Sequence, residues 1–265
     1  MKIVTIIQAR TESSRLFQKT LLPVLGKPIL FRMLERVMLS KLVGQVVVAT
    51  TTNNNDDIIY NHCLSEGYEC FRGNPLDLLD RHYNCALAYN ADVVLKIPSD
   101  CPLIDPNIID GVISKFLDGN YDYCSNLHPA TYPDGMDVEV FSFETLKIAW
   151  KYAKKNFERE HTTPYIWERN KKFKLGNYEW ENGLDYSMTH RLTIDYYEDY
   201  LLINNIFEKL YKKNVIFTLE DVLLYLNENP EILKINSKFN GVNWYRHHIE
   251  ELKTIDQSKT KNCDE

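Results

Sequence analysis

The stretch KIVTIIQARTESSRLFQKTLL (residues 2–22) joins an apolar run to a cationic segment. Residues 2–8 are nearly continuous in apolar and β-branched side chains, which predicts a strand buried on both faces. Cations and hydroxyls follow directly, at Arg10, Ser13, Ser14, Arg15 and Lys19. A surface loop tolerates these residue types without requiring them, whereas a bound polyphosphate requires such donors. The strand is therefore followed either by a phosphate-binding loop or by a solvated cationic turn.

The same alternation of buried strands and amphipathic helices continues through the first two-thirds of the chain. Further strands are expected at residues 45–51, 68–72, 91–97, 121–126 and 136–142. Helices are expected at 28–41, 56–67, 77–89 and 105–117. This order with short links predicts a Rossmann-like α/β fold, with a mostly parallel central sheet flanked by helices.

The last third of the chain changes character. Helices are expected at 158–170, 197–213 and 218–230, with short strands at 173–180 and 190–195. We expect one main domain over residues 1–213, a helical C-terminal extension over 214–255 and a frayed polar tail over 256–265.

Composition excludes several classes of protein. The chain has 265 residues, 44% of them hydrophobic, and a net charge of −6. An acidic chain is a poor candidate for non-specific binding to nucleic acid or anionic membranes. No apolar run approaches the roughly 18–20 residues that span a bilayer. Six cysteines without a C-x-x-C pair indicate reduced thiols, so we expect a cytoplasmic protein. From the acidic charge and the short apolar runs we expect no nucleic-acid or membrane partner.

Polar residues follow the predicted strands where each strand ends. Ligands of parallel α/β sheets bind at the carboxyl ends of the strands. The segments at these ends are 10–19, 50–54, 72–73 and 99–100. We therefore expect all four segments to face one crevice.

The cationic segment has the chemistry of a phosphate site but not the pattern of a P-loop. Two arginines offer bidentate donors, a lysine adds a point charge, and serine hydroxyls and backbone N–H groups add further donors. The segment 9–20 contains no glycine, and G-x-x-x-x-G-K-[ST] is absent. The alternative is a solvated turn in which Ser13 or Ser14 caps a helix.

Two carboxylates are expected at strand ends, at Asp100 and Asp195. Each suits a hard cation such as Mg²⁺ held against phosphate oxygens. The alternatives are a turn or cap residue for Asp100 and a helix N-cap for Asp195. Asp105, followed by Pro106, fits an N-cap without any catalytic role. Two carboxylates beside a cationic loop favour metal-assisted nucleotidyl transfer.

Six motifs in order resemble a known family. They are QARTESSRLFQKTLLPVLGKPIL, FRGNPLDLLDRHY, KIPSDCPLIDP, YPDGMDVEVFS, EREHTTPYI and RLTIDYYEDY. The chain resembles the cytidylyltransferase family of spore-coat polysaccharide biosynthesis proteins, over about residues 2–205. That family is related to the CMP-sugar synthetases for octulosonate and sialic-type acids. The resemblance implies the nucleotide-diphospho-sugar transferase fold of the GT-A type.

The resemblance also implies roles for individual residues. Residues that would bind the CTP phosphates are Arg10, Ser13, Ser14, Arg15 and Lys19, and Arg72 would contact the cytosine. Asp100 and Asp195 match the two metal-binding aspartates. The acceptor side would be lined by Asp134, Asp137, Glu139, Glu160 and His161. Alternatively, His161 is a histidine at a helix N-terminus or core edge, and Glu139 is the polar position of a strand. Asp80 and Arg81 are interpreted as structural.

Some positions depart from the family pattern. Phe17-Gln18 replaces a usual Pro-Gly, and Glu12 stands where a glycine is common. Ser99 stands where many relatives have glycine, and Tyr196-Tyr197 replaces Thr-Pro. These departures bear on affinity and acceptor preference more than on the type of reaction.

We therefore expect a Mg²⁺-dependent cytidylyltransferase with Lys19, Asp100 and Asp195 as catalytic residues. It would transfer CMP from CTP to an acidic sugar, a sugar or alditol phosphate or a similar acceptor, and release pyrophosphate, in surface polysaccharide or glycan biosynthesis. One alternative is a GT-A glycosyltransferase, although the usual Asp-x-Asp position reads Ser-Asp-Cys here. The other is a non-catalytic nucleotide-binding partner of a glycan-assembly complex. By analogy with related synthetases, a homodimer is also expected.

Overall fold

A seven-stranded sheet forms the centre of the molecule. The structure, a computed structural model, describes residues 1–181, 183–212 and 216–262. The strand order is β5 (Glu69–Gly73), β4 (Gln45–Thr51), β1 (Ile3–Gln8), β6 (Val93–Pro98), β8 (Glu139–Ser142), β7 (Tyr123–Ser125) and β9 (Leu175–Asn177). The first four strands are parallel, while β8 runs antiparallel to β6 and β7. A small hairpin, β2 (Pro23–Val24) and β3 (Lys27–Pro28), stands apart. The expectation of a mostly parallel, helix-flanked sheet is confirmed.

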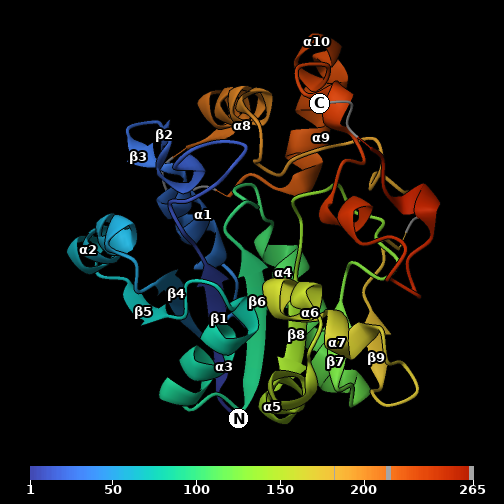
Figure 1. The fold of residues 1–265 in the computed structure, drawn as a ribbon. Coiled ribbons are helices and arrows are strands. Elements are labelled where there is room, and N and C mark those ends of the chain that lie inside the picture. The colour runs from blue at the N-terminus through green and yellow to red at the C-terminus, as the bar shows by residue number, and fades with distance from the viewer. Residues whose placement is uncertain (182, 213–215, 263–265) are drawn as a thin grey trace.

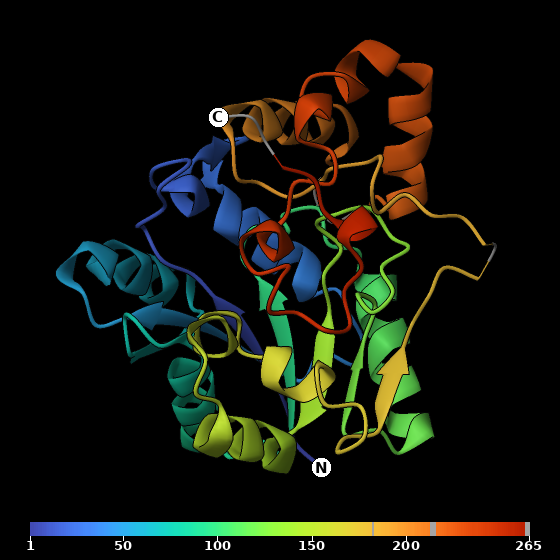
Figure 2. The same ribbon diagram turned by 45° about the vertical axis from the view of Figure 1, so that its right-hand side comes forward.

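Helices cover both faces of this sheet (Figures 1 and 2). One face packs against α1 (Ile29–Val37), α2 (Asp57–Glu66), α4 (Pro106–Gly119) and α8 (Tyr197–Leu210). The other packs against α3 (Leu78–Ala88), α5 (Phe143–Tyr152), α6 (Asn156–His161) and α7 (Pro164–Trp167). Ile6 and Ile7 of β1 belong to different core clusters, as successive residues of a strand must when both faces are buried.

Two expected elements differ from the structure. The helix expected at 158–170 divides into α6 and α7, because Thr162 has a φ of 72° and Pro164 starts a new helix. The strand expected at 190–195 is extended chain with a single β-bridge, between Arg191 and Asp134. The backbone of this segment bonds to the backbone of single residues, Asp134 and Asp100, rather than along a neighbouring strand, which leaves it outside the sheet.

The C-terminal residues lie beyond the carboxyl ends of the parallel strands, opposite the N-terminus (Figure 1). They comprise α9 (Leu219–Glu228), α10 (Pro230–Leu233) and 3₁₀ turns at Ser237–Phe239, Trp244–His247 and Gln257–Lys259. Val222 and Leu226 of α9 join the main core, so the extension packs on the sheet domain. Within the expected tail, the N–H of Lys261 donates to the carbonyl of Gly241. The proposed boundary at 213–214 and residues 263–265 lie outside the described residues.

Two further sequence expectations concern thiols and membranes. The five cysteines within the described part of the chain form no disulfide, and Cys263 lies outside it. No helix in the described ranges is both long and apolar enough to cross a bilayer.

Candidate active site

The loop after β1 is held at its base by a buried carboxylate. Asp56 Oδ1 accepts hydrogen bonds from the N–H of Thr11 at 2.7 Å and from its hydroxyl at 2.8 Å. Asp56 is itself 2% exposed and also bonds the hydroxyl of Thr51 at the end of β4. The loop is thereby fixed against two neighbouring strand ends, while Arg10, Ser14 and Arg15 remain exposed.

The cations of this loop meet both predicted metal-binding aspartates. Lys19 Nζ lies 2.8 Å from Asp195 Oδ1 and 3.2 Å from Asp100 Oδ2. Arg15 donates to the same Asp195 oxygen at 2.7 Å. These contacts join parts of the chain 180 and 81 residues apart. Segments 10–19 and 99–100, two of the four expected to share a crevice, meet here beside Asp195, and the roles of their residues stay predictions.

Backbone tethers fix the two aspartates relative to each other. Asp100 follows β6, and its carbonyl accepts from the N–H of Ile194 at 3.0 Å. The carbonyl of Ile194 in turn accepts from Lys19 at 2.8 Å. Tyr196, and not Asp195, is the N-cap residue of α8, so the carboxylate of Asp195 is free for the crevice. Ser13 accepts from the N–H of Leu16 within a turn, and no helix follows there for it to cap.

The charges around Asp195 keep it ionised. Burial alone would raise the pKa of Asp195, but the Lys19 ammonium and the Arg15 guanidinium outweigh burial and lower this pKa to about 2. Burial likewise opposes the charge on Lys19, yet the carboxylates of Asp100 and Asp195 raise its pKa above the ordinary value. Lys19 is therefore a cation throughout the physiological range.

Asp134 and Asp137, two of the residues predicted to line the acceptor side, lie in the same acidic group. Arg191 bonds Asp134 Oδ2 at 2.9 Å. Burial raises the pKa of Asp134 to about 7, with Arg191 opposing it. Burial, together with the charges of Asp134 and Asp100, raises the pKa of Asp137 to about 8. The two carboxyls therefore gain protons readily, which lets them donate as well as accept hydrogen bonds.

The remaining acceptor-side candidates occupy two other environments. Glu139 is 3% exposed and bonds Lys96 and, at 2.8 Å, the hydroxyl of Tyr123, so its oxygens have internal partners. Glu160 and His161 form a cluster with His248, their ligand-type atoms within 4.8 Å of one another. His161 ends α6 and stacks on Trp244 at 3.8 Å between ring centroids. The acceptor roles of Glu139, Glu160 and His161 stay predictions.

Two arginines singled out from the sequence, Arg72 and Arg81, lie near β5. Arg72 donates to the carbonyls of Thr51 and Asn53, both at 3.0 Å, and pairs with Asp57 at 2.6 Å. A cytosine could contact only those atoms of Arg72 that these internal bonds leave accessible. Arg81, interpreted from sequence as structural, is 4% exposed, and its Nε and one terminal nitrogen have no partner within the described chain. Sequence gave no sign of these orphaned donors.

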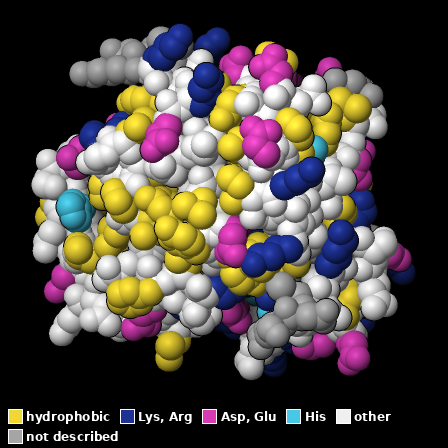
Figure 3. Space-filling view, turned by 90° about the horizontal axis from the view of Figure 1, so that it is seen from above, with side chains coloured by type: hydrophobic (Ala, Val, Ile, Leu, Met, Phe, Trp, Pro, Cys, Tyr) yellow, Lys and Arg dark blue, Asp and Glu magenta, His cyan; other side chains and the backbone are white. Residues whose placement is uncertain are grey.

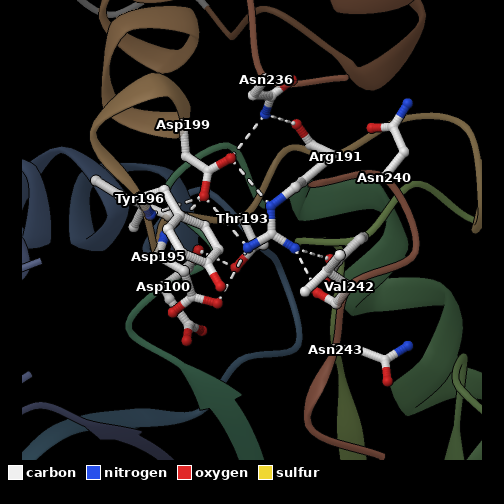
Figure 4. A network of polar contacts seen from close by, with 12 residues as sticks. Asp100, Arg191, Thr193, Asp195, Tyr196, Asp199, Asn236, Asn240, Val242 and Asn243 are labelled. Atoms are coloured by element: carbon white, nitrogen blue, oxygen red, sulfur yellow. Dashed lines mark hydrogen bonds and ion pairs between the residues drawn. The ribbon is translucent and has the colours of Figure 1, made fainter. Parts of the chain in front are cut away.

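Arg191 and Asp199 are the residues that sequence reasoning missed. Arg191 lies within the RLTID motif, for which the sequence pattern predicts a strand and no role for the arginine. Figure 4 shows it at the centre of a polar network with Asp195, Asp199 and the C-terminal segment. It pairs with Asp195 at 3.1 Å and with Asp199 at 3.0 Å. The signal available in the sequence was Arg191 itself, a charged residue within a segment whose pattern predicts a strand.

The donor set fits a divalent cation. Three cations in this group, Arg15, Lys19 and Arg191, face five carboxyl groups, namely Asp100, Asp134, Asp137, Asp195 and Asp199. Because burial raises the pKa of Asp134 and Asp137, these two carboxyls do not add a fixed negative charge at neutral pH. Asp100 and Asp195 already share one cation, the Lys19 ammonium, so both face a common point. Carboxylate oxygens are the ligands that Mg²⁺ prefers.

Solved structures share this architecture. A cytidylyltransferase from Leptospira borgpetersenii serovar Hardjo-bovis is similar with a TM-score of 0.82 and 36% sequence identity, over 88% of this chain and 97% of that chain. A CMP:2-keto-3-deoxy-manno-octonic acid synthetase complexed with CTP shares the fold at a TM-score of 0.60 and 16% identity, over 80% of this chain and 100% of that one. The fold therefore defines a nucleotidyltransferase.

The chain belongs to the cytidylyltransferase family, whose model matches residues 4–225. An uncharacterized protein of Methanocaldococcus jannaschii is 39% identical over 237 residues, which is 89% of this chain and 95% of the relative. The spore coat polysaccharide biosynthesis protein SpsF of Bacillus subtilis is 31% identical over 234 residues, which is 86% of this chain and 95% of SpsF. The resemblance inferred from the six sequence motifs is confirmed.

Proposed function

We propose that this protein transfers CMP from CTP to an acidic or phosphorylated acceptor with the help of Mg²⁺. The single observation that carries the proposal is that Lys19 contacts both Asp100 and Asp195. Arg15 bonds the same oxygen of Asp195, Oδ1, as Lys19 does. A cationic loop and two carboxylates around one point suit a metal–nucleotide and little else. The names of the family and of its solved member support CTP as the nucleotide.

In the proposed reaction, an acceptor oxygen attacks the α-phosphorus of CTP. The bond from that phosphorus to the bridging oxygen breaks, and pyrophosphate leaves. Arg10 and Arg15 offer forked donors to the leaving phosphates, and Ser13 and Ser14 add hydroxyls. Lys19 neutralises charge as it develops on phosphate oxygens. Most of the acceleration would come from such positioning and electrostatic stabilisation.

Asp100 and Asp195 would hold Mg²⁺, which when bound supplies Lewis-acid neutralisation of phosphate charge. On the acceptor side, Asp134 and Asp137 would orient the acceptor by hydrogen bonds. An acceptor carboxylate or phosphate is already ionised, so no strong general base is needed. The class of acceptor we propose is an acidic sugar or a sugar or alditol phosphate, used for surface polysaccharide, as the name of SpsF suggests for that relative.

The test is pyrophosphate release from CTP and Mg²⁺ over a panel of acidic sugars and phospho-alditols. At least one acceptor should support release, and Asp100→Asn should lower the rate by at least about 100-fold. The matched control is Asp118→Asn, an exposed position in α4, which should keep wild-type activity. Undiminished release by Asp100→Asn would refute the metal assignment. Nucleotide binding without release for any acceptor would favour a non-catalytic partner.

We also propose that the protein acts in the cytoplasm as a homodimer. Support comes from exposed apolar residues around α8 and the β2–β3 hairpin, namely Leu25, Tyr197 and Leu201. Figure 3, which views this end of the molecule from above, shows apolar side chains gathered over part of the surface. Sedimentation at micromolar concentration should give twice the chain mass. A monomer there would remove the dimer.

A further inference from the structure

The guanidinium of Arg191 has no donor to spare. Its Nε bonds Asp199 at 3.0 Å, and one terminal nitrogen bonds Asp195 at 3.1 Å and Asp199 at 3.2 Å. The other terminal nitrogen bonds Asp134 at 2.9 Å and the carbonyl of Val242 at 2.8 Å. These five contacts match the five N–H donors of arginine, and the side chain is 1% exposed. Arg191 therefore cannot contact a substrate without breaking an internal bond.

The carboxylate of Asp195 is held from two sides. Its Oδ1 faces the crevice and accepts from Arg15 and Lys19, while its Oδ2 accepts from Arg191. The plane of this carboxylate is thereby fixed, with one oxygen turned toward the site. Asp199 also fixes the backbone of Asp195, because Asp199 Oδ2 accepts a hydrogen bond from the N–H of Asp195 at 2.9 Å.

The C-terminal segment, residues 236–243, completes this arrangement (Figure 4). Asn236 is 1% exposed, and its amide nitrogen donates to Asp199 at 2.8 Å and to the carbonyl of Arg191 at 2.9 Å. Val242 supplies the carbonyl that accepts from Arg191. This segment follows the part of the chain that the family model matches, which ends at residue 225.

We propose that Arg191, held by Asn236 and Val242 of the C-terminal segment, is a positioning residue that aims Asp195 at the bound metal–nucleotide. The C-terminal segment thus belongs to the scaffold of the active site. The inference rests on the proposed function for the identity of the ligand. Its geometry, a carboxylate with one oxygen fixed by an internal arginine, stands independently of the acceptor.

The decisive variant is Arg191→Lys, which keeps the positive charge but loses the fork that bonds two carboxylates at once. Asp195 should then turn away from its present plane. We expect Mn²⁺, titrated calorimetrically in the presence of CTP, to bind about 10–100-fold more weakly, as when outer-shell partners of a ligand are changed. Binding of metal-free CTP should stay near the wild-type value, since its loop contacts are intact.

The control is Arg36→Lys, which removes another buried arginine. Arg36 is 5% exposed and bonds only carbonyls, those of Leu103, Ile104 and Phe217. This variant should lower the melting temperature but leave Mn²⁺ affinity unchanged. Equal losses of Mn²⁺ affinity in both variants would mean general destabilisation and would overturn the proposal.

Asn236→Ala keeps the proposal testable if Arg191→Lys does not fold. It removes two hydrogen bonds from the arrangement and should weaken Mn²⁺ binding several-fold, with CTP binding retained. A folded Arg191→Lys or Asn236→Ala protein with wild-type Mn²⁺ affinity would overturn the inference. Because Mn²⁺ binding needs no turnover, absent pyrophosphate release by the wild type would count against the proposed function alone.

Discussion

At the scale of single residues, burial and charge decide which groups can titrate. Asp195 stays ionised because Lys19 and Arg15 outweigh the effect of burial on its pKa. His82 shows the opposite case, since it is fully buried and its environment offers no anion. Its Nδ1 donates to the carbonyl of Leu78 at 2.9 Å, one turn earlier in α3. The imidazole ring of His82 is therefore neutral in the folded state.

This makes His82 a source of acid sensitivity. Burial lowers the pKa of His82 to about 3, while the unfolded chain binds the proton near pH 6.5. Unfolded chains therefore gain protons first as the pH falls, and the free energy of unfolding drops. Between pH 6.5 and 5 we expect a loss of about 2 kcal/mol from this group. Urea unfolding of wild type and His82→Gln at both pH values measures it.

The exposed His62 provides the comparison for this measurement. His62→Gln removes an exposed side chain and should leave the difference in unfolding free energy between the two pH values unchanged. His82→Gln should reduce that difference. An unreduced difference in His82→Gln would contradict the role assigned to this histidine.

Within the phosphate loop, we expect Lys19 to be irreplaceable by an uncharged residue. Lys19→Gln removes the cation shared by Asp100 and Asp195, so Asp100 loses this ion pair while Asp195 keeps those with Arg15 and Arg191, and the proposed phosphate site loses a cation. The rate of pyrophosphate release should fall by at least about 100-fold. Lys27→Gln, a surface lysine that pairs with Glu35 and Glu66, is the control that should keep activity. Similar rates for the two variants would exclude Lys19 from catalysis.

At the scale of elements, caps and turns decide where the chain places its acids. Asp105 caps α4 as predicted, accepting from the N–H of Asn107 at 2.8 Å, and its second oxygen also accepts from Leu219 at 2.6 Å. The cap was readable from the Asp-Pro pair, but the link to α9 was not, because it joins residues 114 apart. Local rules predict local contacts, and distant ones need the fold.

Gly135 forms the turn between Asp134 and Met136, in the segment predicted to line the acceptor side. Its φ is +103°, and a Cβ there would lie 2.5 Å from backbone atoms of Leu192 and Thr193. Gly135→Ala should therefore push the Asp134 turn away from Arg191 and weaken both folding and turnover. We expect a loss of at least about 2 kcal/mol in unfolding free energy. Thermal and urea unfolding measure this loss.

The comparison for Gly135 is Gly67, which ends α2. Gly67 also has a positive φ, 78°, but nothing lies within 4 Å of its would-be Cβ. Gly67→Ala should cost only the backbone strain, about 1 kcal/mol. Equal losses in the two variants would show that the close approach at Gly135 carries no cost of its own.

At the scale of the whole molecule, the sequence predicted the sheet, its helices and the convergence at its carboxyl edge. Apolar strand runs such as residues 2–8 and the rule on carboxyl ends were enough for that. The prediction failed at residues 190–195, where the backbone bonds to single residues, Asp134 and Asp100, instead of pairing with a neighbouring strand. It also missed that Glu139 and Arg72 have internal partners, because such contacts depend on neighbours distant in the chain.

The C-terminal segment allows a prediction about the thermal stability of the whole molecule. Removing residues 236–265 deletes Asn236 and the Val242 carbonyl, so Asp199 and Arg191 each lose a buried hydrogen-bond partner while keeping their bond to each other. Unpaired buried groups cost about 1–3 kcal/mol each, so the melting temperature should fall by several degrees or more. Removing residues 263–265 alone should change nothing. Equal melting temperatures for the two deletions would contradict this account.

The contact between Arg15 and Asp195 has a consequence for how the protein is made. Its partners are 180 residues apart, so a ribosome must finish most of the chain before they can meet. Early portions can form the strands near the start, yet they lack part of the proposed nucleotide site. If that proposal holds, a nascent chain gains nucleotide affinity only after synthesis and folding have both reached the last third of the polypeptide.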